Sequence, residues 1–433
     1  MNKNIALFLL LSTTIMAGVN NIKSFVLQNG LQAILVPDFR APIINVQVWY
    51  KVGASFESNG STGISHALEH MMFRGTSKFP NYNSSIADLG GKHNAFTSHD
   101  FTAYYQIAPK ENLEKILELE ADRMVNLQIT KDLFVKEMAA ILEERRMRVD
   151  DAPMGLAMER FMALAFLSNP YHNPIIGWEG DIKQYTVEDA IGWYKKWYAP
   201  NNAIIVIAGD IDEGEAKRLV SKHFSLLKSR QLPKVKNKES QPIISNKKIY
   251  LSQPVSRNQL VIGYKVPSIL NIDEKWHFYA LDILSELLAK NITDDLQQKH
   301  GLISKSSVSC NNLKLYDDLF IVDLTLNSGI KYSAVEQSFI NIITRMKLHP
   351  VSQDKLKAIK AKVASSYVFM KDSLNDKALT AGFLAALGLP LDFSDKYVEN
   401  VNNITAEQLQ QVVQLYFKKN IMMYVRAKGS RLL

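Results

Sequence analysis

The sequence predicts an α+β fold of two related domains, each an antiparallel sheet packed with helices, joined by a polar linker. Three observations predict it. Strand-like segments come first, helical patterns follow, and a strand-like segment closes the first half. At 433 residues the chain is too long for one hydrophobic core, and a weakly apolar stretch divides it. A helix–strand pattern recurs on both sides of that stretch.

The first half begins with strands. Ser24 to Val36 has the pattern of two short strands joined at Asn29-Gly30, which is a hairpin signal. Ile43 to Val52 alternates and is rich in β-branched residues, which predicts another strand. The segment from Gly60 to Gly63 then leads into a helix, with Thr62 as its candidate N-cap.

The rest of the first half is mostly helical by its periodicity. The pattern predicts a strand at Phe101 to Ala108, helices at Glu111 to Asn126, Asp132 to Val149 and Met154 to Leu167, and a final strand at Ala203 to Ala208.

The linker is predicted at Ser229 to Pro242, where two prolines and a run of Lys and Gln leave little apolar content. We therefore expect a first domain over residues 18–228, a linker over 229–245 and a second domain over 246–433. The second domain opens near Lys247, with strands predicted at Ile249 to Gln253 and Gln259 to Val266.

An internal repeat supports this division. Thr186 begins a helical pattern that runs to Trp197, and Thr405 begins one that runs to Tyr416, with identical spacing and a strand after each. Both threonines fit as N-caps with acids in the first turn. The two copies predict a duplicated domain.

The N-terminus has the pattern of a secretory signal peptide over residues 1–17. Lys3 precedes an apolar run from Ile5 to Leu11 that extends to Ala17, which is too short to span a bilayer. Cleavage is expected near Ala17-Gly18; the alternative is an uncleaved N-terminal anchor. We expect export, into the periplasm if the cell has two membranes, with no stable membrane span after the signal is removed.

Composition agrees with a globular enzyme. Hydrophobic residues make up 47% and charged residues 22%, close to ordinary soluble proteins. The formal charge of +8 is modest for this length, and no Lys/Arg tract has interleaved aromatic residues, so nucleic-acid binding is not expected. Cys310 is the only cysteine, which excludes an intrachain disulfide.

The most informative stretch is His66-Ala67-Leu68-Glu69-His70. Two imidazoles four residues apart on a helix point from one face and can bind one metal ion. Glu69 lies three residues after His66, on the same side, where it can reach a water molecule beside the metal. The order H-x-x-E-H reverses the commoner zinc-protease motif H-E-x-x-H. The alternative is a surface helix with two solvated histidines.

A third ligand weakens that alternative, because a catalytic zinc needs three protein ligands and one open position. Glu137 and Glu144 lie seven residues apart, two turns along one face of a predicted helix. Either could complete a His2Glu site, and the other could hold a ligating histidine.

These residues resemble the pitrilysin/insulinase family of inverted zincins, in its short branch that is similar to bacterial and mitochondrial processing peptidases. The resemblance runs from about Phe25 to the C-terminus and is stronger in the first half. Further matches to the family pattern are Phe73-Arg74-Gly75-Thr76, residues 90–97, residues 102–105, Pro170-Tyr171-His172, Ile176-Gly177 and residues 198–202.

The resemblance implies a role for each matching residue. His66, His70 and Glu144 would bind one Zn²⁺ per chain, Glu69 would be the general base, and Glu137 would support a ligand from behind. The strand around Asn94, Ala95, Phe96 and Thr97 would pair with an extended peptide substrate. The early helix of the second half, near Trp276 to Lys290, has no H-x-x-E-H, so one metal site per chain follows.

One departure concerns the second half. Active family members carry an Arg and a Tyr seven residues apart, where this chain has Gln297 and Ser304. The Tyr would stabilise the oxyanion, and the Arg would bind the substrate backbone. This predicts a zinc-bearing subunit of a two-chain peptidase, in which a paralogous partner supplies those groups; a homodimer is the other arrangement.

Two function hypotheses follow. The first is a zinc metalloendopeptidase that hydrolyses peptides or unstructured polypeptides. The second is a non-catalytic structural or partner-binding homologue, which the missing Arg and Tyr favour. A neighbouring reading frame with the Arg/Tyr pair and a degraded H-x-x-E-H would favour the paired enzyme.

Overall fold

The computed structural model describes residues 22–234 and 245–427. The predicted signal peptide and part of the predicted linker therefore lie outside the described residues. In the first half the elements are β1 (Lys23–Val26), β2 (Gln32–Pro37), β3 (Ile43–Tyr50), η1 (Ala54–Phe56), α1 (Ile64–Met71), α2 (Tyr82–Asp88), β4 (Lys92–Thr97), β5 (Thr102–Pro109), η2 (Lys110–Asn112), α3 (Leu113–Asn126), α4 (Lys131–Arg145), η3 (Arg146–Asp150), α5 (Pro153–Ala165), η4 (Pro170–His172), α6 (Glu179–Ile182), α7 (Val187–Trp197), η5 (Pro200–Asn202), β6 (Ala203–Gly209) and α8 (Glu213–Phe224).

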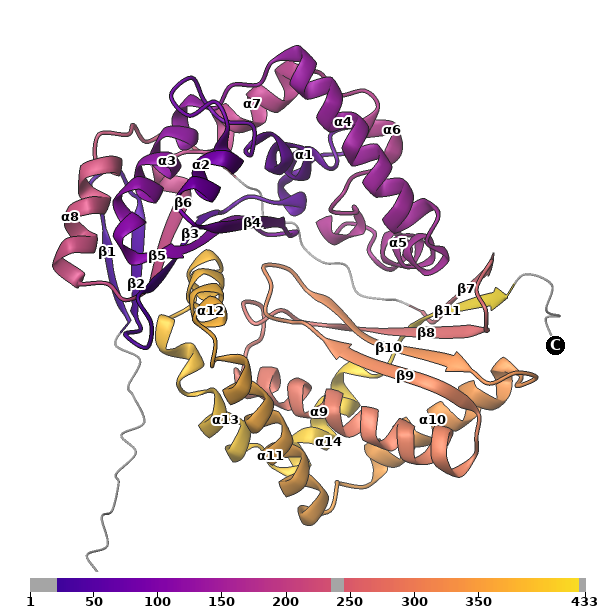
Figure 1. Ribbon diagram of the computed structural model, residues 1–433. Helices are drawn as coiled ribbons and strands as arrows, with labels where there is room; N and C mark the ends of the chain where they lie inside the picture. Colours follow the sequence, from indigo (N-terminus) through magenta and orange to yellow (C-terminus); the bar gives the residue numbers. More distant parts are fainter. Residues whose placement is uncertain (1–21, 235–244, 428–433) are drawn as a thin grey trace, which may run out of the picture.

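The second half repeats the plan with a longer helical section. Its elements are β7 (Lys247–Gln253), β8 (Gln259–Val266), α9 (Trp276–Ile292), η6 (Thr293–Lys299), β9 (Ile303–Cys310), β10 (Asp318–Leu326), α10 (Tyr332–Leu348), α11 (Gln353–Met370), α12 (Leu374–Ala386), η7 (Leu391–Ser394), α13 (Tyr397–Asn403), α14 (Ala406–Tyr416) and β11 (Ile421–Ala427). Figure 1 shows the two halves one above the other, each with its own sheet and helices.

The two sheets share one topology. The first has the order β1-β2-β6-β3-β5-β4 and the second β7-β11-β8-β10-β9, so the second lacks only an equivalent of β1. In each sheet the closing strand pairs in parallel with one neighbour, β6 with β2 and β11 with β7, and every other ladder is antiparallel. The α+β fold is confirmed, and each sheet is antiparallel as predicted except for this one parallel ladder.

The predicted elements agree with the structure at most positions. The hairpin turn between β1 and β2 contains Gly30 at φ +86°, a conformation that favours glycine. Thr186 and Thr405 both cap their helices with a complete capping box, as the repeat predicted. The helix predicted over residues 132–149 is shorter: α4 ends at Arg145 and continues as a π-helical turn, η3.

Helices cover both faces of the first sheet, but they come from different halves. Residues of β6 are buried along its whole length. On one face, Ile205 and Ile207 belong to a core shared with α1, α3 and α7. On the other face, Ile204 and Val206 pack against alanines of α12, which belongs to the second half. Figure 1 shows α12 between the two sheets.

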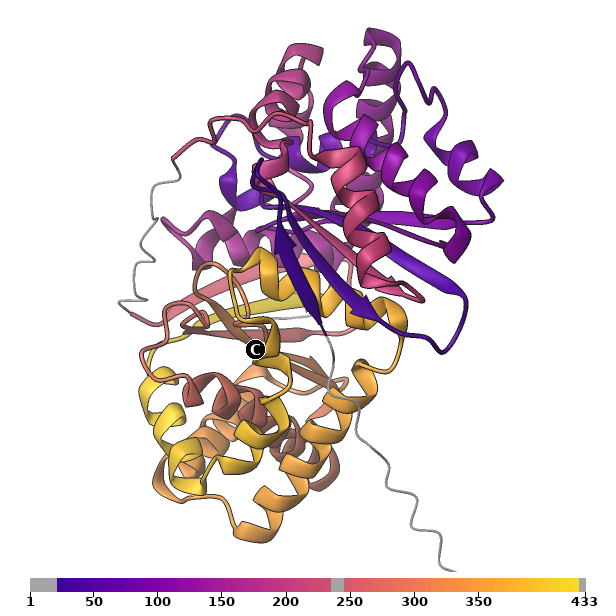
Figure 2. The ribbon, with the colours of Figure 1, turned by 90° about the vertical axis from the view of Figure 1, so that its left-hand side faces the viewer.

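The covering helices are exchanged between the halves. As α12 covers the first sheet, α5 of the first half covers the second sheet, where Phe161 packs among Val261, Ile421 and Met423. The view in Figure 2 shows the two halves in close contact along this region. The contacts are tight: a Cβ on Gly382 of α12 would lie 2.2 Å from Trp49.

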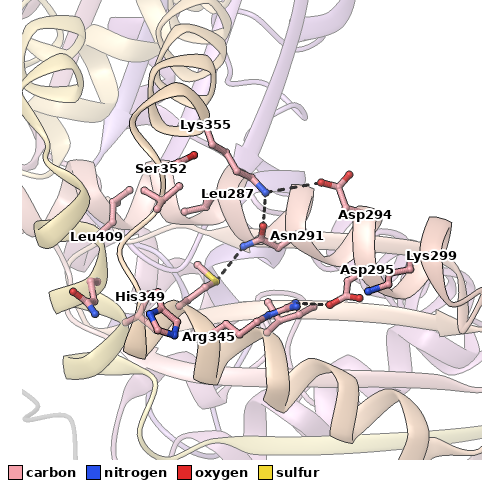
Figure 3. A pocket seen from close by; sticks show the side chains of 15 residues that line it. Leu287, Asn291, Asp294, Asp295, Lys299, Arg345, His349, Ser352, Lys355 and Leu409 are labelled. Atoms are coloured by element: carbon pink, nitrogen blue, oxygen red, sulfur yellow. Dashed lines mark hydrogen bonds and ion pairs between the residues drawn. The ribbon is translucent and has the colours of Figure 1, made fainter.

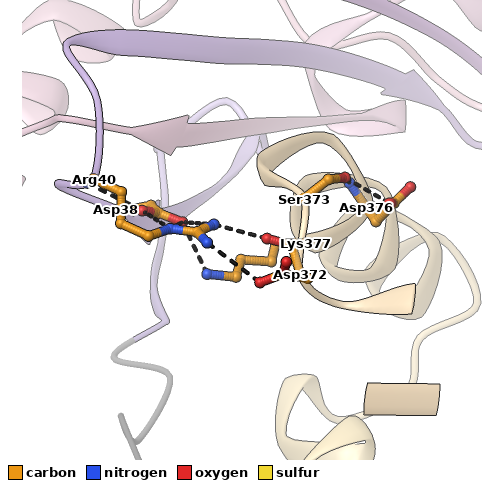
Figure 4. Close-up of polar contacts among 6 residues, drawn as sticks. All are labelled: Asp38, Arg40, Asp372, Ser373, Asp376 and Lys377. Carbon is orange, nitrogen blue, oxygen red and sulfur yellow. Dashed lines mark hydrogen bonds and ion pairs between the residues drawn. The ribbon is translucent and has the colours of Figure 1, made fainter. Parts of the chain in front are cut away.

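An ionic cluster fixes the start of α12 on the first half (Figure 4). Asp38, after β2, accepts hydrogen bonds from Arg40 Nε and Lys377 Nζ, each at 2.8 Å. Arg40 also donates to the backbone carbonyl of Asp372 at 2.7 Å. The hydrogen bonds from Arg40, and then those from Lys377, hold the pKa of Asp38 well below its ordinary value.

Candidate metal centre

The H-x-x-E-H motif lies on α1, and a buried carboxylate caps that helix. The backbone N–H groups of Gly63 and Ser65 donate to Glu57 at 2.7 and 2.8 Å. They satisfy amides that have no intrahelical partner. Burial raises the pKa of Glu57 to about 7, against the opposing effect of these hydrogen bonds.

Thr62 does not cap this helix, so that prediction is wrong. The N-cap is Gly63, at φ +87°, and its side-chain capping role is taken by Glu57. The Thr62 hydroxyl instead donates to Asp181 at 2.6 Å and accepts from the backbone N–H of Trp178 at 2.9 Å. Thr62 therefore ties the start of α1 to α6.

The structure brings His66, His70 and Glu144 together. Nε2 of His66 lies 3.7 Å from Oε2 of Glu144, and Nε2 of His70 lies 3.4 Å from the same oxygen. One donor atom from each of the three residues lies within 4.8 Å of the others. Tetrahedral zinc with bonds of about 2.0–2.2 Å separates its ligand atoms by about 3.3–3.6 Å. The two separations from Glu144 are close to this range, so small side-chain movements would let the two imidazoles and the carboxylate hold a zinc ion.

The protonation state of the His66 imidazole also suits a metal. Burial, and then the charges of His70 and Arg148, lower the pKa of His66 to about 3. His66 is therefore neutral at physiological pH, which is the form that binds metal.

Glu137 lies behind His70, on the side away from Glu144. Its Oε2 is 3.5 Å from Nδ1 of His70, and its other oxygen is paired with the guanidinium of Arg74. A metal-ligating histidine usually donates its second ring N–H to such an acceptor, which fixes the tautomer. Glu143, next to Glu144, instead pairs with Arg146 in an exposed position.

Arg148 lies on the other side of the cluster. Its Nη1 is 2.8 Å from Oε1 of Glu144, the oxygen that does not face the imidazoles. Arg148 lies in the π-helical turn η3 that follows α4. Arg148 is not among the site residues predicted from sequence, although its spacing of four residues from Glu144 is that of a contact along a helix.

Glu69 is buried beside the donors, with 9% of its surface exposed. It accepts a hydrogen bond of 2.5 Å from the hydroxyl of Thr97 on β4. Burial raises the pKa of Glu69, although the Thr97 hydrogen bond acts in the opposite direction. A carboxylate with a raised pKa is a better proton acceptor than one in water.

A cavity of about 590 Å³ contains this cluster. Its lining includes the three donors, Glu69 and Arg148, and also all four residues predicted to contact substrate: Asn94, Ala95, Phe96 and Thr97. These four lie on β4, which is the edge strand of the first sheet and pairs on one side with β5. An edge strand beside a cavity can accept an extended peptide as an added strand.

The other histidines near the site have structural contacts. His93 packs between the rings of Phe73 and Tyr82. Nε2 of His99 lies 3.1 Å from the backbone oxygen of Asn173, and burial lowers the pKa of His99 to about 4.

Gln297 and Ser304 lie together in the second half. The Gln297 amide donates to the backbone oxygen of Ser304 at 3.3 Å, across the junction of η6 and β9. Neither residue lines the metal cavity.

Another cavity, of about 480 Å³, lies among α9, α10, α11 and α14 (Figure 3). In its lining, Lys355 Nζ donates to Asn291 at 2.7 Å and lies 3.9 Å from Asp294, and Arg345 pairs with Asp295. Within residues 22–234 and 245–427, the cluster of His66, His70 and Glu144 is the one group of three such donors brought together.

No helix within the described residues is both long and apolar enough to cross a bilayer.

Two family descriptions match consecutive parts of the chain. Residues 33–179 match "Insulinase (Peptidase family M16)", and residues 184–363 match "Peptidase M16 inactive domain". The first contains the whole donor cluster with Glu69.

Individual relatives are consistent with these two family matches. The chain is 30% identical over 410 residues to "Zinc protease PqqE" of Helicobacter pylori, which covers 92% of this chain and 90% of the relative. It is 31% identical over 205 residues to "Probable mitochondrial-processing peptidase subunit beta, mitochondrial" of Arabidopsis thaliana, covering 47% of this chain and 38% of that one. The solved structure of a protease from Helicobacter pylori superposes with a TM-score of 0.87 at 28% identity, covering 94% of this chain and 100% of that chain.

Proposed function

The chain belongs to the insulinase family of peptidases, M16, and on that premise we propose that it is a zinc metalloendopeptidase that cleaves peptides or unstructured polypeptides. The observation that carries the proposal is that three potential metal donors and a buried glutamate line the same cavity. His66, His70 and Glu144 would leave one position of a tetrahedral zinc ion open for a water molecule, and Glu69 lines the same cavity.

The partners of the three glutamates support different roles for them. Glu137 is paired with Arg74 and Glu144 with Arg148, so each carboxylate has a cationic partner that holds it in place. Glu69 has the neutral Thr97 hydroxyl as its partner. A carboxylate without a cationic partner is the one that can take up and release a proton, and we assign Glu69 as the general base.

In the proposed reaction, a bound zinc ion would polarise the scissile carbonyl and acidify the attacking water. Glu69 accepts the proton of that water and later returns it to the leaving amine. Thr97 holds the Glu69 carboxylate through its hydroxyl, and Glu137 holds His70 in one orientation. Residues Asn94 to Thr97 would bind the substrate backbone along the edge of β4.

We further propose that this chain works with a second chain. Gln297 and Ser304 have neither the charge of an Arg nor the reach of a Tyr hydroxyl, so a paralogous subunit, or a second copy, would supply those groups. One relative is named as the beta subunit of a processing peptidase, which supports this arrangement. The apolar N-terminal stretch supports export, into the periplasm if the cell has two membranes.

The catalytic proposal is tested with Glu69→Gln. This variant should keep its zinc and lose hydrolysis of an unstructured polypeptide by at least about 10²–10⁴-fold, because an amide cannot accept the proton. Cleavage products can be followed by mass spectrometry over hours, which detects weak turnover. Glu143→Gln is the matched control, since Glu143 is exposed and paired with Arg146, and it should stay near wild type. Near-normal turnover by Glu69→Gln would refute the assignment of the base.

The two-chain proposal is tested by mixing. Turnover of a flexible peptide is measured for this chain, for a paralogous chain that carries the Arg and Tyr, and for both. We expect a large gain in the mixture. Equal activity of the lone chain would refute the pairing, and an inert mixture with zinc bound would favour the non-catalytic, partner-binding alternative.

A further inference from the structure

Arg148 differs from the other arginines around the metal centre in the role of its partner. Arg74 pairs with Glu137, Arg145 with Glu159, and Arg146 with Glu143; none of these three carboxylates is a metal donor. Arg148 pairs with Glu144, which is one. Because a bound metal would share the negative charge of Glu144, the charge of Arg148 would be the least neutralised of the four.

The guanidinium of Arg148 is also open to the cavity. Its side chain is 75% exposed, and it lines the cavity that contains Glu69 and β4. One nitrogen faces Glu144, which fixes the side chain and leaves the rest of its planar fork of donors toward solvent. A fixed guanidinium fork matches the geometry of a carboxylate.

Among the residues that line this cavity, Arg148 is the one Lys or Arg side chain. The fixed charges in its lining are Glu69, Glu144, Glu159 and Arg148, and Glu159 is already paired with Arg145. Val149, Ile175 and Ile176 add apolar wall. The chain as a whole carries a formal charge of +8, which favours the approach of acidic polypeptides.

We propose that Arg148 is a specificity-determining residue that binds a carboxylate of the polypeptide substrate close to the scissile bond. This rests on the proposed peptidase function. The carboxylate comes either from an acidic side chain or from the C-terminus of a short peptide. Arg148 thereby selects substrates with Asp or Glu, or a free C-terminus, near the position of cleavage.

The test measures binding rather than turnover, with the full chain carrying Glu69→Gln and saturated with zinc, as checked by metal analysis. Fluorescence anisotropy compares labelled peptides that have Glu or Gln at each of four positions around a cleavage position. Each peptide is made with a free and an amidated C-terminus, which separates the two sources of the carboxylate.

We expect at least about tenfold tighter binding of the acidic peptide at one position, as for a hydrogen-bonded charged pair. Adding Arg148→Gln should reduce that ratio to about one, Arg148→Lys should keep part of it, and Arg148→Glu should favour a Lys peptide. Arg160→Gln removes an exposed arginine outside the cavity and should leave the ratio unchanged.

Equal binding of the Glu and Gln peptides, no measurable binding of either, or a ratio unaffected by Arg148→Gln would each overturn the proposal. If wild type hydrolyses none of the peptides, either alone or mixed with the paralogous chain, while the Arg148-dependent preference persists, the peptidase function fails and the carboxylate site stands.

Discussion

A short chain of contacts links the guanidinium of Arg74 to the metal centre. Arg74 pairs with Glu137, and Glu137 faces Nδ1 of His70, whose other nitrogen faces Glu144. Each contact fixes the next, so His70 is oriented before a metal arrives. Supporting residues of this kind typically contribute 10–100-fold to metal affinity.

Arg74→Gln and Glu137→Gln should therefore each weaken zinc binding by about 10–100-fold without changing the fold. Titration against a chelator of known affinity measures this, with circular dichroism as the check on folding. Arg146→Gln, which breaks an exposed pair with Glu143, is the control. Wild-type affinity in both variants would show that the contacts behind His70 do not support the site.

For individual residues, the sequence predicts the metal donors better than the side chains that hold those donors in place. The pairs His66/His70 and Glu137/Glu144 are local repeats on single helices, so their faces follow from helical geometry. Arg74 and Glu137 are 63 residues apart, and Glu69 and Thr97 are 28 apart. Those contacts depend on how helices and sheet pack, which no local pattern encodes.

Among the elements, α12 has the most demanding position, because it leaves its own half to cover the first sheet. Its small residues allow a close approach to Trp49, and its first turn is held by Asp38 through Lys377. Asp38 is largely buried and must stay ionised to accept from both Arg40 and Lys377.

Asp38→Asn should destabilise the protein by about 2 kcal/mol at pH 7, the scale of hydrogen bonds to charged groups. The pKa of Asp38 is lower in the folded than in the unfolded state, so its stabilisation is present above the unfolded pKa and is lost as pH falls through the folded pKa. The difference in unfolding free energy between wild type and variant should therefore shrink toward low pH.

Urea unfolding of both proteins between pH 7 and pH 3 measures that difference. Asp376→Asn changes a partly exposed carboxylate in the first turn of the same helix, which accepts from the Ser373 hydroxyl, and is the control. A difference that grows on acidification would contradict the role of an ionised Asp38.

For the elements, sequence prediction failed where a distant residue decides the outcome. Thr62 is a residue type that commonly caps helices and lies just before α1. The backbone amides at the start of α1 donate instead to the side chain of Glu57. The end of α4 was placed too late because nothing in residues 132–149 breaks the helical pattern, whereas the structure inserts a π-helical turn after Arg145.

In the whole molecule, the exchange of α5 and α12 makes the halves depend on each other. Each half has its own sheet, and the second sheet repeats the order of five of the six strands of the first. Yet each sheet has one face covered by a helix of the other half. The sequence does not predict this exchange, because it depends on packing between residues far apart in the chain.

The first half expressed alone, ending at residue 234, should not fold stably, because removal of α12 exposes Ile204, Val206 and Trp49. We expect aggregation or binding of a hydrophobic dye, and recovery of a soluble complex when both halves are co-expressed as separate chains. Size-exclusion chromatography measures this. A monomeric first half that unfolds as cooperatively as the full chain would contradict this dependence.

The central claim is that His66, His70 and Glu144 hold one zinc ion beside Glu69, and metal analysis of the purified full chain tests it most directly. After zinc loading and desalting, wild type and Glu69→Gln should each retain about one zinc per chain, while His70→Ala and Glu144→Gln should retain little. Full zinc retention in both of the latter variants would contradict the account.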